Sequence, residues 1–246
     1  MEWTDSGFIL ATRRHGETSL IVEAFTPARG RHLGLVKGGR SARQRAILQP
    51  GNRVRLIWRA RLSEHLGHFT VEAEALNAAD IMRDRLALAA LNIVTELVRL
   101  LPERDPHEQL FALFAEIVEG LPERPGWPGN LARFELRLLA ELGFGLDREG
   151  CAATGTSEEL VYVSPKSGRA VSAAAGAPYA EKMLPLPAFL RVDSSLPEDL
   201  ETLLEAFRLT GFFLNRNIYG PRGIAAPQSR ARLLRLLQQA REKAAG

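Results

Sequence analysis

Cysteine is almost absent from this sequence: Cys151 is the only one in 246 residues, so the chain forms no internal disulfide bond. Nothing in its cysteine usage indicates an oxidising compartment. No stretch of eighteen consecutive apolar residues occurs, and the N-terminal run Met1-Glu2-Trp3-Thr4-Asp5 lacks the basic and apolar segments of a secretion signal. We therefore expect a soluble cytoplasmic protein without a membrane segment, and its 46% apolar content is enough for a substantial core.

Residue groupings that carry catalysis or bind metal are also missing. Cys151 has no histidine near it in sequence, and a structural zinc site needs four sulfur or imidazole ligands. His65 and His68 flank Gly67 in a predicted hairpin turn, which accounts for their spacing without a metal. Lys37-Gly38-Gly39-Arg40 lacks the spacing and terminal Lys-Ser/Thr of a P-loop, so we interpret it as a flexible basic loop. We expect no catalytic residue, no cofactor and no bound metal.

Acidic residues are absent from one long stretch, and this absence is the most informative feature of the chain. Between Ala24 and Ser63 there is no aspartate or glutamate, whereas ten cations occur. Neighbouring cations repel unless an external polyanion neutralises them, and nucleic acid is the first candidate. The ten cations are Arg29, Arg31, Lys37, Arg40, Arg43, Arg45, Arg53, Arg55, Arg59 and Arg61.

The first third of the chain has the pattern of short strands. Five β-favouring runs are separated by glycine-containing turns, and the run over residues 53–59 alternates apolar residues with arginines, which predicts one buried and one cationic face. Five strands within about eighty residues favour a small barrel of the oligonucleotide-binding (OB) type. The predicted strands are Gly7 to Thr12, Ser19 to Phe25, His32 to Val36, Arg53 to Arg59 and Phe69 to Leu76, with a loop or short helix over Gly38 to Pro50.

From Ile81 the apolar period changes to 3.6 and predicts helices. Residues 86–101 are apolar almost all round, which indicates a buried helix. Asp105 is the expected cap of the next helix, a further helix is predicted from about Pro128 to Leu142, and Ser195 and Ser229 are expected to open the last two. Between residues 147 and 176 the helical pattern lapses around one strand-like run, 160–163, which predicts a small hairpin insertion.

These patterns together predict an α+β protein of two domains. Residues 1–79 form an OB-fold β-barrel that binds nucleic acid, and residues 80–246 form a helical domain with the hairpin at about 147–176. Trp58 and Phe25 are expected in the core, so that contacts with the phosphate backbone outweigh base stacking. The predicted nucleic-acid-binding residues are Arg29, Arg31, Lys37, Arg40, Arg43, Arg45, Arg53 and Arg55.

The order of several short stretches resembles the bacterial recombination-repair family RecO, and the resemblance spans nearly the whole chain. Single stretches are weak signals, but their order is specific. They are Gly7-Phe8-Ile9-Leu10, His15-Gly16-Glu17-Thr18-Ser19, Gly30, Val36-Lys37-Gly38-Gly39-Arg40, Gln49-Pro50-Gly51, Thr95-Glu96-Leu97, Leu101-Pro102-Glu103-Arg104-Asp105-Pro106, Leu110-Phe111, Arg133-Phe134-Glu135, Leu138-Leu139, Leu142-Gly143, Gly220, Ser229 and Arg230.

The resemblance implies a nucleoid-associated protein that binds single- and double-stranded DNA and anneals complementary strands. It also implies work with RecR, and in many bacteria RecF, to load RecA onto strands coated by SSB, without a cofactor. In relatives the helical domain receives the acidic tail of SSB, for which Arg133 is the candidate here; the alternative is a surface salt bridge of Arg133 with Glu135 or Glu141. Some relatives bind zinc through four cysteines at the hairpin, whereas this chain keeps only Cys151.

The residues by themselves are also compatible with two other functions. Phosphate neutralisation does not distinguish sugars, so an OB-fold factor that binds structured RNA is the alternative to a DNA-binding protein. An enzyme whose site is assembled from distant residues is the third hypothesis, and a deep pocket of converging Asp, Glu or His side chains would support it.

Overall fold

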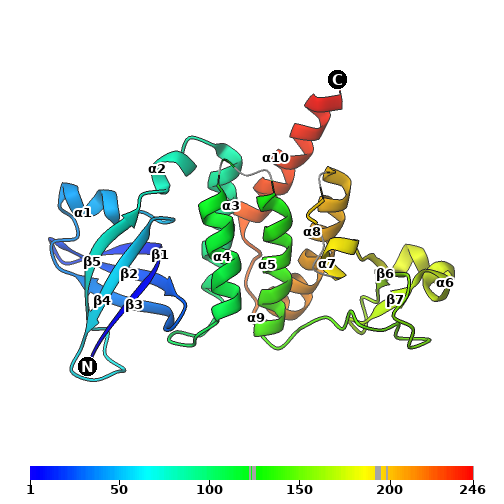
Figure 1. Cartoon of the computed structure of the whole chain (residues 1–246), viewed down its shortest axis with the longest axis horizontal. Coiled ribbons are helices and arrows are strands. Elements are labelled where there is room, and N and C mark those ends of the chain that lie inside the picture. Colours follow the sequence, from blue (N-terminus) through cyan, green and yellow to red (C-terminus); the bar gives the residue numbers. More distant parts are fainter. Residues whose placement is uncertain (122, 124–125, 192–194, 198, 246) are drawn as a thin grey trace. The chain divides into compact units, whose positions relative to one another are not determined.

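A computed structural model describes residues 1–121, 123, 126–191, 195–197 and 199–245. The chain divides into two compact units, Met1–Arg124 and Pro125–Gly246 (Figure 1). Within its described residues, the first unit therefore holds four helices in addition to the strands of the barrel. Within the described residues, no helix is both long enough and apolar enough to cross a membrane.

The first unit contains a closed five-stranded barrel with strand order β1-β2-β3-β5-β4, in which β1 also pairs with β4. All pairs are antiparallel except the short contact of β3 with β5. The five runs predicted from alternation are the five strands, and the segment after the third contains a short helix. The elements are β1 (Glu2–His15), β2 (Ser19–Thr26), β3 (Gly30–Val36), α1 (Ala42–Ile47), β4 (Arg53–Arg59), β5 (His68–Ala75), α2 (Ala78–Ile81), α3 (Arg85–Val98) and α4 (Glu108–Gly120).

The barrel closes around one apolar cluster because alternate residues of each strand point inward. In β4, Val54, Leu56 and Trp58 are buried, while the three arginines of the strand are at least partly exposed, as the alternation predicts. In β5 the inward face ends at Val71, and Ala73 is exposed beside a register shift against β4. Trp58 and Phe25 are both core residues, as expected, so neither offers a free stacking surface.

A neutral histidine lies among the aromatic rings of the barrel. His32 is 3% exposed, its ring centroid lies 5.1 Å from those of Trp3 and Trp58, and its Nδ1 lies 2.9 Å from the carbonyl oxygen of Leu33. Burial disfavours the charged imidazolium and lowers the pKa of His32 to about 4. The imidazole is therefore uncharged at neutral pH.

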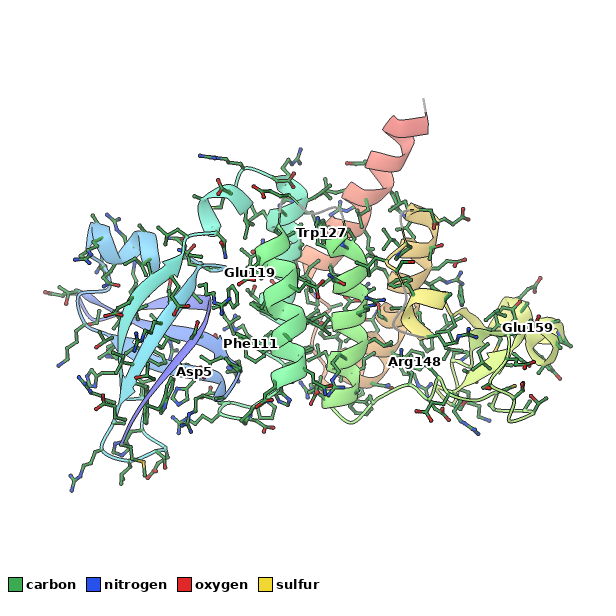
Figure 2. All side chains as sticks on the ribbon, in the orientation of Figure 1. Asp5, Phe111, Glu119, Trp127, Arg148 and Glu159 are labelled. Carbon is green, nitrogen blue, oxygen red and sulfur yellow. The ribbon has the colours of Figure 1, made fainter. Side chains whose placement is uncertain are left out.

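Helix α4 covers the outer face of β1 and β2. The rings of Phe111 and Phe114 pack against Phe8 and Phe25 with centroids 5.3–5.9 Å apart, edge-on in every pair except the tilted pair Phe8–Phe111. Figure 2 shows Phe111 and Glu119 on the side of α4 that faces the strands. This packing explains why the first unit extends beyond the barrel to residue 124.

The N-terminus of α4 differs from the prediction. His107, rather than Asp105, is the N-cap residue, and it makes no side-chain cap bond. The Asp105 backbone instead packs so closely on Gly30 that a Cβ there would lie 1.9 Å from its carbonyl oxygen. Gly30 also has φ of +60°, so both space and backbone conformation require glycine. This tertiary contact ties the segment before α4 to the start of β3.

The second unit is mostly helical and contains a small sheet. Strand β6 lies between β7 and β8, so the predicted hairpin has a third strand that the sequence pattern does not reveal. Its elements are α5 (Trp127–Glu141), β6 (Leu160–Val163), β7 (Ala170–Ser172), α6 (Ala173–Gly176), η1 (Ala177–Lys182), β8 (Leu184–Pro185), α7 (Ala188–Arg191), α8 (Leu200–Leu214), the π-helical η2 (Asn215–Tyr219), α9 (Gly220–Arg222) and α10 (Gln228–Ala245).

Two of the predicted helix starts are wrong. Asp199, not Ser195, caps α8, because its carboxylate accepts a hydrogen bond of 2.7 Å from the Thr202 amide. Residue 196 packs instead against the glycines at 126 and 129. Ser229 lies inside the first turn of α10 rather than before it. Residue 198, which was expected to take part in the opening of α8, lies outside the described residues.

A buried ion pair joins three helices of the second unit. Glu135 of α5 is fully buried, and its carboxylate accepts hydrogen bonds from the Arg230 guanidinium of α10 at 2.7 and 3.0 Å. The hydroxyl of Thr210 on α8 donates to the same carboxylate at 2.5 Å. Removal of one partner of such a pair would leave the other charge buried and uncompensated, so the contact links α5, α8 and α10.

Candidate nucleic-acid interface

The basic segment after β3, expected to be a flexible loop or a short helix, forms a hydrogen-bonded turn followed by the short helix α1. The Ser41 amide donates to the Gly38 carbonyl at 3.0 Å, and the Arg40 amide donates to the Thr18 carbonyl at 3.1 Å. Ser41 then caps α1 through its hydroxyl, which accepts from the Gln44 amide. The segment is thereby tied to the β1–β2 turn, and Lys37, Arg40, Arg43 and Arg45 are all exposed on it.

Three arginines from separate elements converge on one cleft of about 410 Å³, which we call the cationic cleft. Arg14 comes from the end of β1, Arg40 from the turn and Arg45 from α1. None of the residues that the structure places around this cleft is acidic. Its remaining lining residues are Thr12, Leu20, Leu48 and Gln49.

A second cleft of the first unit, of about 430 Å³, is neutralised internally. Arg31 donates to Glu23 at 2.6 Å and lies 3.6 Å from Glu103, and Arg99 lies 3.0 Å from Glu23. Arg31 is only 15% exposed and Glu23 8%. Arg31, a predicted binding residue, therefore has carboxylate partners that lie outside the acid-free stretch in sequence.

Two further arginines of the stretch also have carboxylate partners. Arg53 pairs with Glu119 of α4 at 2.5 Å and with Glu74 of β5 at 3.4 Å. Arg59 pairs with Glu2 across the β1–β4 ladder at 2.9 Å, and its hydrogen bond lowers the pKa of the Glu2 carboxyl. These pairs neutralise part of the charge that the sequence alone assigns to an external partner.

Arg29 and Arg55 remain on the exposed surface. The guanidinium carbon of Arg29 lies 5.7 Å from the centroid of the Trp3 ring, so the aromatic face orients it. Arg55 is exposed on β4 and opposite Glu72 in the β4–β5 register. The eight predicted residues thus separate into an exposed set and the two ion-paired arginines at positions 31 and 53.

One arginine holds the loop between β4 and β5. The Arg104 guanidinium donates to the consecutive carbonyls of Ser63, Glu64 and His65 at 2.6, 3.1 and 2.9 Å. Its backbone has φ of +66°, a left-handed conformation that is uncommon for a residue with a side chain and that recurs at functional sites. The predicted turn at residues 65–68 is therefore fixed from outside the barrel.

Arg133 lies beside an aromatic ring in the second unit. Its guanidinium donates to the carbonyl oxygen of Phe189 at 3.3 and 3.4 Å and lies 5.9 Å from the centroid of that ring. Both acids considered as its salt-bridge partners have other arginines: Glu135 pairs with Arg230, and Glu141 pairs with Arg137. Arg133 thus combines a cation with an adjacent apolar ring.

Two arginines of the first unit, Arg14 and Arg104, were not among the predicted site residues because both lie outside the acid-free stretch. Arg14 precedes the acid-free stretch, and only the antiparallel return of β1 onto β2 brings it to the cationic cleft. Arg104 lies in the stretch Leu101–Pro106, which carries part of the RecO resemblance, and this stretch was the one feature of the sequence that pointed to Arg104. Its role depends on contacts about forty residues away in sequence.

The hairpin around Cys151 is closed by backbone hydrogen bonds. The Cys151 amide donates to Thr156 at 2.7 Å, and the Gly168 amide donates to Ser164 at 2.9 Å. The buried sulfur accepts the Ser172 amide at 3.3 Å. Among the described residues, no cluster of three or more His, Cys, Asp or Glu side chains could hold a metal ion.

These observations define a class of protein: a small barrel with an exposed cationic surface, joined to a helical unit that carries an inserted hairpin. A basic surface on such a barrel is typical of nucleic-acid binding. Two family models match the chain, the recombination protein O N-terminal model over residues 1–77 and the C-terminal model over residues 82–223. The chain belongs to the RecO family.

Curated relatives agree with this assignment. The chain is 54% identical over 239 residues to the DNA repair protein RecO of Mesorhizobium japonicum, covering 97% of this chain and 94% of the relative. It is 55% identical over 235 residues to that of Chelativorans sp., covering 95% and 94%. It is 54% identical over 231 residues to that of Rhizobium etli, covering 94% and 90%.

Proposed function

We propose that the chain is a non-enzymatic mediator of recombinational DNA repair, which binds and anneals DNA strands and helps RecR to load RecA onto SSB-coated single strands at the nucleoid. Membership of the RecO family supports the repair role. The observation that carries the binding role is the cationic cleft, which has no acidic lining residue, together with the exposed cations at positions 37 and 43 of the same segment.

The proposed mechanism is electrostatic. The exposed cations displace counterions from two strands, which lowers their mutual repulsion and allows complementary bases to pair. The five-stranded order with α1 between β3 and β4 supports an OB-type barrel. We propose residues 1–79 as the DNA-binding domain and 80–246 as the helical domain, a division that the two family segments support.

The helical domain is the proposed receptor of the acidic SSB tail. Such a tail ends in an apolar residue and a carboxylate, and therefore needs a cation beside an apolar surface. Arg133 next to the Phe189 ring has this combination. Arg137, one helical turn further along α5 and paired with Glu141 at 2.6 Å, supplies a matched control position.

A strand-annealing assay on SSB-coated oligonucleotides tests the proposal. We expect annealing by the whole chain, slower annealing when SSB lacks its tail, and a loss of this tail dependence in Arg133→Ala but not in Arg137→Ala. Annealing by the wild-type chain that does not depend on the tail would remove Arg133 from the interface.

A competition experiment with DNA and RNA of the same sequence separates the two nucleic acids. We expect DNA to compete at least as well as RNA. Strong preference for a structured RNA would instead favour the RNA-binding alternative. If neither DNA nor RNA binds at low salt, the binding role is refuted.

A further inference from the structure

The cationic cleft differs from a general phosphate-binding surface because three arginines from separate elements line it together. A flat basic surface spaces its cations along the backbone of a strand, whereas Arg14, Arg40 and Arg45 line one cavity of about 410 Å³. Like charges gathered in this way repel one another and favour an anion between them. The neighbouring cleft of similar size gathers Arg13, Arg31 and Arg99 but supplies Glu23 and Glu103 as counter-charges.

Two of the three arginines of the cleft, Arg40 and Arg45, lie on segments that hydrogen bonds tie to the rest of the barrel. The Arg40 guanidinium donates to the backbone carbonyl of Glu17, and its own amide bonds to the β1–β2 turn. Arg45 lies on α1, whose C-terminal end is fixed by the buried Asn52, which donates to the carbonyls of Ala46 and Ile47 at 2.9 Å. The backbone from which the Arg40 and Arg45 side chains extend is therefore already ordered before an anion binds.

The size and floor of the cleft limit what it can take. Its volume lies near the lower end of the range of small-molecule sites, which is about 300 to 1,000 Å³, and it suits one nucleotide unit rather than a duplex. The floor contains the apolar side chains of Leu20 and Leu48, while the polar side chains of Thr12 and Gln49 complete the lining.

The charge of the cleft selects between kinds of phosphate. An internal phosphodiester carries one negative charge, whereas a terminal phosphate monoester carries about 1.5 to 2 at neutral pH and has three acceptor oxygens. Guanidinium groups bind phosphate oxygens in pairs of parallel hydrogen bonds, so several arginines around one phosphate are matched best by the monoester.

We propose that Arg14, Arg40 and Arg45 form a binding site for the terminal phosphate monoester of a nucleic-acid strand. This inference rests on the nucleic-acid binding proposed above and adds recognition of strand ends to it. The remaining exposed cations would bind the internal phosphates of the same strand.

The test measures binding of one single-stranded oligonucleotide with a 5′-phosphate, with a 3′-phosphate, or with hydroxyl groups at both ends. For the wild-type chain we expect a phosphorylated end to raise the affinity roughly tenfold, the scale of one charge-assisted interaction. The preference should be larger at pH 7.5 than at pH 5, because the second ionisation of a phosphate monoester has a pKa of about 6.

Adjacent residues of β1 provide the control. Arg13 and Arg14 are both exposed and line different clefts, since successive residues of a strand point to opposite faces. Arg14→Gln, and separately Arg45→Gln, should remove the preference for a phosphorylated end. Arg13→Gln removes the same charge from the same strand and should leave that preference intact.

The outcomes separate this inference from the proposed function. Equal affinity of the wild-type chain for phosphorylated and hydroxyl ends would overturn the end site while leaving general binding in place. A preference that Arg14→Gln and Arg45→Gln retain would also overturn it. If none of the oligonucleotides binds at low salt, the proposed function fails and the end site with it.

Discussion

The salt dependence of DNA binding is the quantity that best tests which cations meet phosphate. Each cation that neutralises a phosphate of a single strand contributes about 0.7 to the slope of log affinity against log salt. The exposed residues Lys37, Arg40, Arg43 and Arg45 should all contribute. Their joint replacement by alanine is therefore expected to reduce the slope by about 2.8 on single strands and by about 3.6 on duplex DNA.

This change is large enough to measure directly. When the salt concentration rises from about 50 to 200 mM, a slope difference of 2.8 means that the wild-type chain loses about 50-fold more of its DNA affinity than the fourfold variant does. Fluorescence anisotropy of a labelled oligonucleotide over this range gives both slopes. An unchanged slope in the fourfold variant would exclude the turn and α1 from the binding site.

A double substitution that leaves the net charge unchanged distinguishes exposed arginines from ion-paired ones. Arg53→Gln combined with Glu119→Gln removes an ion pair without a change in net charge. Because Arg53 is already neutralised, the slope should stay within about 0.2 of the wild-type value, whereas Arg45→Gln alone should lower it by about 0.7. A drop of equal size in both would show that Arg53 exchanges Glu119 for DNA, which would refute the division of cations made from the structure.

Three further predictions concern stability and order. Glu135→Ala should destabilise the second unit by about 3 to 5 kcal/mol in urea unfolding, since it leaves the Arg230 charge uncompensated, whereas Arg137→Ala on the same helix should cost only about 0.3 to 0.5 kcal/mol. Because the pKa of His32 is lowered in the folded state, its contribution to stability is complete above about pH 6.5 and is lost as the pH falls towards 4. The difference in stability between wild type and His32→Phe should change by about 2 kcal/mol between pH 7 and 5. Arg104→Gly, which keeps the left-handed backbone unstrained, should accelerate hydrogen exchange at residues 60–68 by about tenfold or more.

For each of these three predictions, one outcome would contradict it. Equal losses of stability in Glu135→Ala and Arg137→Ala would mean that water compensates the Arg230 charge once the Glu135 carboxylate is removed. Parallel stability curves for wild type and His32→Phe would mean that the imidazole is hydrated in the native state. Unchanged exchange in the β4–β5 loop after loss of the guanidinium would remove Arg104 as its support.

Two features of the RecO resemblance acquire a physical reason from the structure. The stretch Arg133-Phe134-Glu135 and the pair Ser229-Arg230 are almost a hundred residues apart, and they meet in the buried ion pair between Glu135 and Arg230. Similarly, Arg104 in the stretch Leu101–Pro106 holds the β4–β5 loop of the barrel. In both cases a short motif is one half of a tertiary contact.

Local pattern alone located the strands of the barrel and most of the long helices, and it predicted the basic character of the barrel. Period-two alternation located β4 at residues 53–59, and period 3.6 located α5 to within one residue at each end. These features depend on backbone geometry and on which face of an element is apolar, and both are written into neighbouring residues. The RecO resemblance could also be recognised from the sequence, because it consists of short local stretches in a fixed order.

Only the tertiary structure decided which charges are available to a partner. An arginine in an acid-free stretch can still find a carboxylate from elsewhere, as Arg31, Arg53 and Arg59 do. Conversely, Arg14 joins the cationic cleft although it lies outside that stretch. Electrostatic interaction depends on distance in space and not on separation along the chain, so the sequence located a cationic domain, and folding selected the arginines left exposed on it.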